Sequence, residues 1–119
     1  MDMPVDISDT AIGSFDLIAT AARLRAGKEY AANGRSAQTL AKAPQMNVVL
    51  TVINEGVELA EHAAPGSVTL TVVEGEIAFM SGDDERVVKA GNSVVFAGDV
   101  RHSVRGESEA AFLLVIAKA

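Results

Sequence analysis

Two histidines, His62 and His102, offer the main chemistry that the side chains of this 119-residue chain can supply. A neutral imidazole binds ions such as Zn, Ni, Fe, Mn or Cu, and it also serves as a general base. Each histidine lies near a turn marked by glycine, and we expect each to stand at the start of a strand. In an antiparallel barrel, residues forty apart can face each other across the interior. We expect both histidines to point into one pocket, within reach of a shared ion or ligand atom. The alternative is that His62 is a partly exposed or hydrogen-bonded structural residue.

Composition excludes several other kinds of chemistry. The chain has no cysteine, which removes disulfides, thiolate metal ligands, iron–sulfur clusters and cysteine nucleophiles. No serine lies in a Gly-x-Ser-x-Gly turn, and no glycine loop of the phosphate-binding kind occurs. A formal net charge of −6 argues against binding to nucleic acid and to anionic membranes.

The elements that must position the histidines are short strands. From Ser36 onward, β-rich runs alternate with turn residues, which predicts an antiparallel sandwich or barrel. The run 67–75 alternates cleanly, so that its apolar side chains share one face of a strand. We expect an apolar interior that suits a small, largely apolar ligand. The residues predicted to line this pocket are Val68, Leu70, Val72, Val94 and Phe96.

The first part of the chain predicts a helix over residues of about 15–32, following a weakly specified arm. Ser14 or Asp16 is the expected N-cap, and Gly27 weakens or splits the helix. The pair Asn33-Gly34 is the expected stop, because both residues tolerate positive φ. We therefore divide the chain into an arm and helix over 1–36 and a barrel over 37–119, within one structural domain.

Two runs, 46–53 and 110–117, are apolar on both faces, so each needs a second cover besides the barrel core. The N-terminal helix or another subunit can supply it. Because we do not expect one short helix to cover both runs, we expect a homodimer. The start of the chain lacks the basic and apolar regions of a secretion signal, and no apolar run reaches the ~20 residues of a membrane span. We therefore expect a cytoplasmic protein.

The spacing of glycines and histidines resembles the motifs of small single-domain cupins of the conserved-barrel type. In the first motif, Gly56 is followed by five residues and then by His62, and Gly75 closes the motif at the family's spacing. The family's second histidine and its glutamate correspond to Ala64 and Val68 here. Neither replacement has a lone pair to donate to a metal.

The second cupin motif is matched around the other histidine. Gly91 opens it, and His102 stands at the position of the family's histidine. Ala97, Asp99 and Gly106 replace the family's usual Pro, Gly and Asn. The resemblance covers roughly residues 37–117, and it rests on spacing more than on ligands.

The resemblance implies a cupin jelly-roll barrel with a short N-terminal helix, and a homodimer that pairs through its sheets. It also implies that His62 and His102 are what remains of a metal site with three His and one Glu. With two of four ligands lost, a divalent metal (Zn, Ni, Fe or Mn) is loosely held or absent. Asp99 is the best spare carboxylate.

Three functions remain open. The first is a barrel that binds a small, largely apolar ligand beside two pocket histidines. The second is a metal-dependent enzyme of the dioxygenase or isomerase type, with a two-His site completed by water. The third is metal-free acid–base catalysis by one histidine, for which the sequence offers no orienting carboxylate. The identity of the ligand or substrate is not readable from the sequence.

Overall fold

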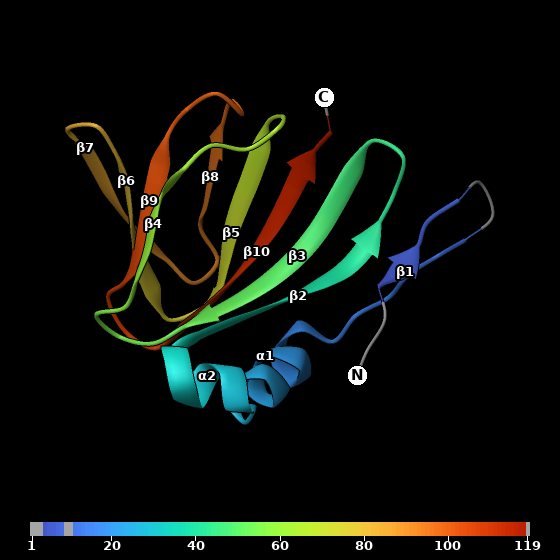
Figure 1. Cartoon of the computed structure of the whole chain (residues 1–119), viewed down its shortest axis with the longest axis horizontal. Coiled ribbons are helices and arrows are strands. Elements are labelled where there is room, and N and C mark those ends of the chain that lie inside the picture. Colours follow the sequence, from blue (N-terminus) through green and yellow to red (C-terminus); the bar gives the residue numbers. More distant parts are fainter. Residues whose placement is uncertain (1–3, 9–10, 119) are drawn as a thin grey trace.

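Two β-sheets face each other, and two short helices pack against the outer side of one of them (Figure 1). This computed structural model describes residues 4–8 and 11–118, except for the side chains of residues 61 and 62. The helices are α1 (Leu17–Arg25) and α2 (Lys28–Asn33). The strands are β1 (Val5–Asp6), β2 (Arg35–Lys42), β3 (Met46–Ile53), β4 (Glu58–His62), β5 (Val68–Glu74), β6 (Glu76–Ser81), β7 (Asp84–Lys89), β8 (Ser93–Phe96), β9 (His102–Gly106) and β10 (Ala110–Ala117).

The sheet topology confirms the all-β prediction. One sheet has six strands in the order β1-β2-β3-β10-β5-β8, and the other has four in the order β4-β9-β6-β7. Neighbouring strands are antiparallel, except that β1 runs parallel to β2. β3 and β10 span the two runs that the sequence marks as apolar on both faces. β2 begins at Arg35, two residues before the boundary drawn at 37.

The core between the sheets follows from the alternation of side chains along the strands. Along β5, Val68, Leu70 and Val72 are buried while Thr69 and Thr71 are partly exposed, as the period of two requires. The buried side chains of both inner faces form one cluster that holds the sheets together. Its members are Ile53, Leu70, Val72, Ile77, Phe79, Val88, Val104, Ala110 and Phe112.

The predicted N-terminal helix is present as two shorter helices. The Asp16 carboxylate accepts a hydrogen bond from the Ala19 amide at 3.0 Å, which makes Asp16 the N-cap. The helical run breaks at Gly27, which stands immediately before α2. α2 ends where Gly34 adopts a φ of 73°, a left-handed conformation that favours glycine. Glycine and cap residues therefore mark the expected boundaries.

The helices cover the outer face of the six-stranded sheet (Figure 1). A second apolar cluster joins them to β2, β3 and β10 and contains Ala21, Tyr30, Leu40, Leu50, Val52 and Ala111. The N-terminal segment thus supplies a second cover for the two doubly apolar strands. The contribution of another subunit stays a prediction. Neither helix of the described chain is long and apolar enough to span a membrane, and the cytoplasmic location stays a prediction too.

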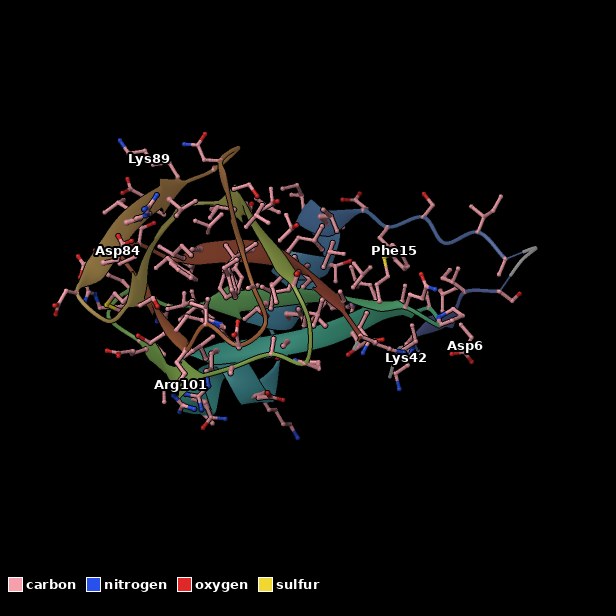
Figure 2. The ribbon with its side chains drawn as sticks, turned by 90° about the horizontal axis from the view of Figure 1, so that it is seen from above. Asp6, Phe15, Lys42, Asp84, Lys89 and Arg101 are labelled. Carbon is pink, nitrogen blue, oxygen red and sulfur yellow. The ribbon has the colours of Figure 1, made fainter. Side chains whose placement is uncertain are left out.

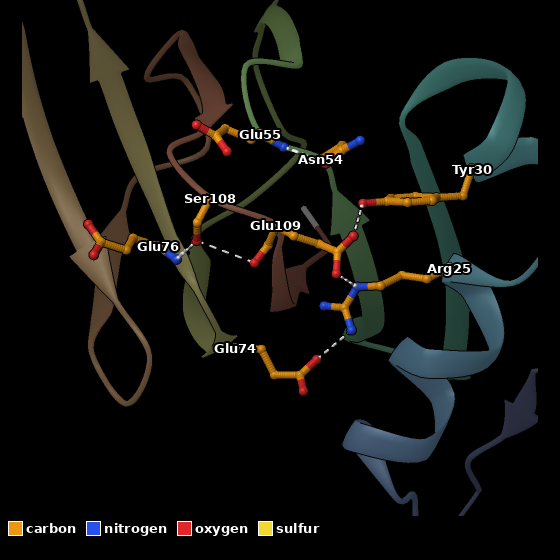
Figure 3. A network of polar contacts seen from close by, with 8 residues as sticks. All are labelled: Arg25, Tyr30, Asn54, Glu55, Glu74, Glu76, Ser108 and Glu109. Carbon is orange, nitrogen blue, oxygen red and sulfur yellow. Dashed lines mark hydrogen bonds and ion pairs between the residues drawn. The ribbon is translucent and has the colours of Figure 1, made fainter.

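A network of charged and polar groups fastens the helices to one end of the sheet (Figure 3). The Arg25 guanidinium lies 2.8 Å from Glu74 and 3.7 Å from Glu109. The Tyr30 hydroxyl donates a hydrogen bond to Glu109 at 3.1 Å. Burial, and then this bond to Glu109, raise the pKa of Tyr30 above its ordinary value. The network engages Glu74 with helix α1.

Candidate functional site

The backbone brings the two histidine positions together, but not in the way the sequence suggested. His102 begins β9, as predicted, whereas His62 is the last residue of β4 and does not begin a strand. β4 and β9 are antiparallel neighbours, and residues 62 and 102 are partners in their register. The two positions therefore lie side by side in one sheet. The neighbouring backbone positions are compatible with a shared pocket, and the approach of the two imidazoles stays a prediction, because the His62 side chain lies outside the described residues.

His102 is a buried residue within a cluster of aromatic rings. Its imidazole stacks on Phe79 with centroids 5.5 Å apart and an interplanar angle of 16°. Its centroid lies 4.5 Å from that of Phe96, and the two phenyl centroids are 4.9 Å apart. Phe96 belongs to the six-stranded sheet and the other two rings to the four-stranded sheet. The cluster therefore joins the two sheets.

The tautomer of His102 follows from its hydrogen bond. Nδ1 lies 3.2 Å from the carbonyl oxygen of Val100. Because a carbonyl oxygen only accepts, this contact assigns the proton to Nδ1. In the neutral ring Nε2 is then the nitrogen with the lone pair. With 4% of its surface exposed, His102 is almost fully removed from water.

A cavity of about 260 Å³ lies next to the aromatic cluster. It lies between the β6–β7 hairpin and β8. β7 is the last strand of the four-stranded sheet, and β8 is the last strand of the six-stranded sheet. The barrel wall is not closed by strand pairing between these two edges. Asp84 marks this end of the molecule in Figure 2, opposite the end marked by Asp6 and Lys42. The lining residues are Phe79, Ser81, Asp84, Arg86, Val94, Val95, Phe96 and Val100.

The five residues predicted to line a pocket divide between two environments. Val94 and Phe96 line this cavity and are partly buried against the core. Val68, Leu70 and Val72 are buried on the inner face of β5, deeper in the barrel. All five make the interior apolar, and their contact with a ligand stays a prediction.

The charged residues of the cavity rim form an ion pair. Arg86 donates from Nε to Asp84 Oδ1 at 3.2 Å and from Nη2 to Oδ2 at 3.1 Å. These hydrogen bonds, with the positive charge of Arg86, lower the pKa of Asp84 below its ordinary value.

Phe79, Asp84 and Arg86 were not singled out from the sequence. The two-residue turn between β6 and β7 was the available signal, because its length fixes which residues pair across the hairpin.

The donor set of the described residues does not fit a metal ion. Ala64 lies in the loop after β4, where its amide bonds to the Gly98 carbonyl at 2.9 Å, and Val68 is buried. Asp99 is exposed in the turn before β9, and Glu74 is paired with Arg25. Among the residues whose side chains are described, no group of three or more His, Cys, Asp or Glu could hold an ion. The His62 side chain lies outside those residues, so the His62–His102 metal site stays a prediction.

Comparison with known proteins points to one family. Residues 49–117, more than half of the chain, match the family described as "Cupin domain". Comparison with curated protein sequences finds no match.

Solved structures show the same fold at low sequence identity. A protein of unknown function from Streptococcus pyogenes, SPY1581, is 18% identical over 100% of this chain and 96% of its own, with a TM-score of 0.74. An RmlC-like cupin from Methanocaldococcus jannaschii is 17% identical over 93% of both chains, with a TM-score of 0.69. KdgF from Halomonas sp. is 16% identical over 72% of this chain and 82% of its own, with a TM-score of 0.66.

Proposed function

Because the chain belongs to the cupin family, whose barrel hosts many unrelated activities, we propose its function from the cavity rather than from the fold. We propose that it binds a small, largely apolar molecule in the cavity between the β6–β7 hairpin and β8. The observation that carries this proposal is the apolar floor of that cavity, made by Phe79, Val94, Phe96 and Val100.

The size and chemistry of the cavity support a compact ligand. Sites for drug-sized molecules span about 300–1,000 Å³, and this cavity, at about 260 Å³, lies just below that range. Two phenyl rings beside the cavity favour an apolar or aromatic body, which gains from burial and from ring contacts. One ring or a short branched chain is therefore the expected ligand body.

His102 acts in this proposal as a positioning residue. Its ring contacts both Phe79 and Phe96, and its Nδ1–H bonds to the Val100 carbonyl. Phe79, Phe96 and Val100 all line the cavity, so His102 supports three of its walls from behind. A buried imidazole with a satisfied N–H does this at little cost.

The test is binding of small neutral probes, followed by NMR on the isotope-labelled protein. We expect benzyl alcohol to shift the signals of Val94 and Val100, and glucose, which has no apolar body, to leave them unchanged. Phe96→Ala should weaken binding of benzyl alcohol by about tenfold or more, since it removes one wall. Val87→Ala is the matched control, because Val87 is exposed on β7 and does not line the cavity. No shift with benzyl alcohol, or equal weakening by both variants, would overturn the proposal.

A second candidate is the metal-dependent enzyme, and the observation in its favour is the pairing of positions 62 and 102 in the β4–β9 register. Partners in an antiparallel pair lie within ~5.5 Å of each other between Cα atoms, which is close enough for two imidazoles to share an ion. Elemental analysis of protein purified without an affinity tag tests this. A metal at about one ion per chain would favour the enzyme, whereas its absence from the natively purified protein would favour the ligand-binding barrel.

A further inference from the structure

The inner face of β7 places two charged residues at the rim of the cavity. In the β6–β7 register Arg86 pairs with Phe79, and Asp84 pairs with Ser81. Partners in an antiparallel pair carry their side chains on the same face of the sheet. Phe79 faces the buried core, so Arg86 and Asp84 stand on the inner side too, and all four residues line the cavity.

The guanidinium of Arg86 is accessible from water and has donors to spare. Its side chain is 64% exposed, and that of Asp84 is 59% exposed. A guanidinium has five N–H donors, and Asp84 takes two of them in the described structure. Asp84 occupies the edge of the guanidinium that carries Nε and one Nη2 donor, so the two Nη1 donors and the second Nη2 donor stay available to an anion. An anion can therefore bind Arg86 without breaking the ion pair.

We propose that Arg86 makes this cavity selective for small monocarboxylates, with the apolar body of the ligand on Phe79 and Phe96 and its carboxylate at the rim. The inference rests on the proposed ligand-binding function and adds the chemical class of the ligand. A planar guanidinium matches a carboxylate with two parallel hydrogen bonds. The ligand carboxylate uses the remaining donors of Arg86 or takes the place of Asp84 on Arg86. Because the Asp84 side chain is exposed, water can solvate it once it is displaced.

The cavity geometry supports one carboxylate rather than a more highly charged anion. Arg86 and Asp84 are the charged residues that line this cavity in the described structure, and together they are neutral. A singly charged ligand therefore meets one cation with no surplus positive charge around it. The net charge of −6 disfavours polyanions as well.

The experiment compares benzoate with its uncharged isostere benzamide and with the cation benzylamine, by NMR titration at low ionic strength. We expect benzoate to bind about fivefold more tightly than benzamide, the upper range for one exposed ion pair. Arg86→Gln should reduce the affinity for benzoate to that for benzamide and leave benzamide unchanged. Arg35→Gln removes the same charge from an exposed position at the start of β2 and should change neither affinity.

The outcomes separate this inference from the proposed function. Equal binding of benzoate and benzamide, loss of benzoate preference with both variants, or stronger binding of benzylamine would overturn the role of Arg86. Benzyl alcohol and benzamide would then still bind, and the ligand-binding function would stand. If none of the neutral probes binds, the proposed function fails, and the inference fails with it.

Discussion

Replacing Arg25 with Met should separate the N-terminal helices from the sheet energetically. Arg25 is the cation between Glu74 and Glu109, and its side chain is only 18% exposed (Figure 3). Methionine keeps the length and apolar contacts of the arginine stem while it removes the charge and the donors. The loss leaves the Glu74 carboxylate, which is half-buried, without its ion-pair partner at the end of β5.

The magnitude lies between two limits. Breaking a fully buried ion pair costs ~3–5 kcal/mol, whereas an exposed pair is worth at most ~1 kcal/mol. Glu74 is 32% exposed and Glu109 is 56% exposed, so water compensates a large part of the loss. We expect Arg25→Met to lower the free energy of unfolding by about 1–2 kcal/mol. For a chain of this length that corresponds to a Tm lower by roughly 4–8 °C.

The assay is thermal and urea unfolding followed by circular dichroism, with a matched control on the same helix. Arg23→Met removes the same charge from an exposed position, where one contact of Arg23 is a hydrogen bond to Gln38. We expect a smaller loss of stability than for Arg25→Met, because water compensates an exposed charge. In a double-mutant cycle, Arg25→Met and Glu74→Gln should be coupled by about 1 kcal/mol. Equal effects of the two arginine variants, or a coupling near zero, would refute the assignment of this network as the fastening between helices and sheet.

Three further outcomes follow from particular contacts. The raised pKa of Tyr30 means that its contribution to stability is present below about pH 10 and is lost as the pH rises through the native pKa. Between these pH values the free energy of unfolding of Tyr30→Phe should therefore fall less steeply with pH than that of the parent, and an equal slope would contradict this. The double variant Ala64→His with Val68→Glu should gain more in Tm from added Zn or Ni than the parent does. Its two new donors bind the metal, whereas without metal the new carboxylate is buried at a cost to stability. Equal responses of the two proteins would mean that the cupin register of His62 is wrong. We expect a homodimer by analytical ultracentrifugation, since Met46 and Val95 on the strands of the six-stranded sheet remain 40% and 72% exposed; a concentration-independent monomer would contradict it.

Much of the fold could be predicted because most strands carry a period of two and end at turn residues. β3 and β10 coincide with the two doubly apolar runs, and the alternation along β5 separates buried valines from threonines as expected. The helices follow from Asp16, Gly27 and Gly34, whose preferences are local. Local signals of this kind depend on neighbours in sequence, so they survive without any knowledge of the tertiary structure.

The position of His62 was misread because the order of turn and strand differs between the two motifs. The turn at Pro65-Gly66 follows His62, so the strand that contains it precedes the turn. For His102 the turn comes first and the strand second. In an antiparallel pair, the end of one strand lies opposite the start of the other. Because β4 ends at His62 and β9 begins at His102, the two positions lie side by side in one sheet.

The cavity could not be located from the sequence because its position depends on which strands end the sheets. β7 and β8 follow each other along the chain but end different sheets, and nothing in their residues marks them as the edges between which the wall stays open. The charged residues at the cavity rim could in part have been predicted from the hairpin. If the turn consists of residues 82–83, Arg86 pairs with Phe79 and its side chain lies on the same face of the sheet.

His102 shows that a position in a family motif does not by itself assign a metal. In the described structure its N–H is bonded to Val100 and its ring packs against both Phe79 and Phe96. The ring contacts favour a planar side chain at position 102, and the Val100 carbonyl favours one with an N–H donor, whether or not an ion is bound at the other nitrogen. The family motif and the aromatic packing therefore predict the same residue for different physical reasons. The ring packing also joins the two sheets at the barrel end where Ala64 and Val68 stand at the other two ligand positions.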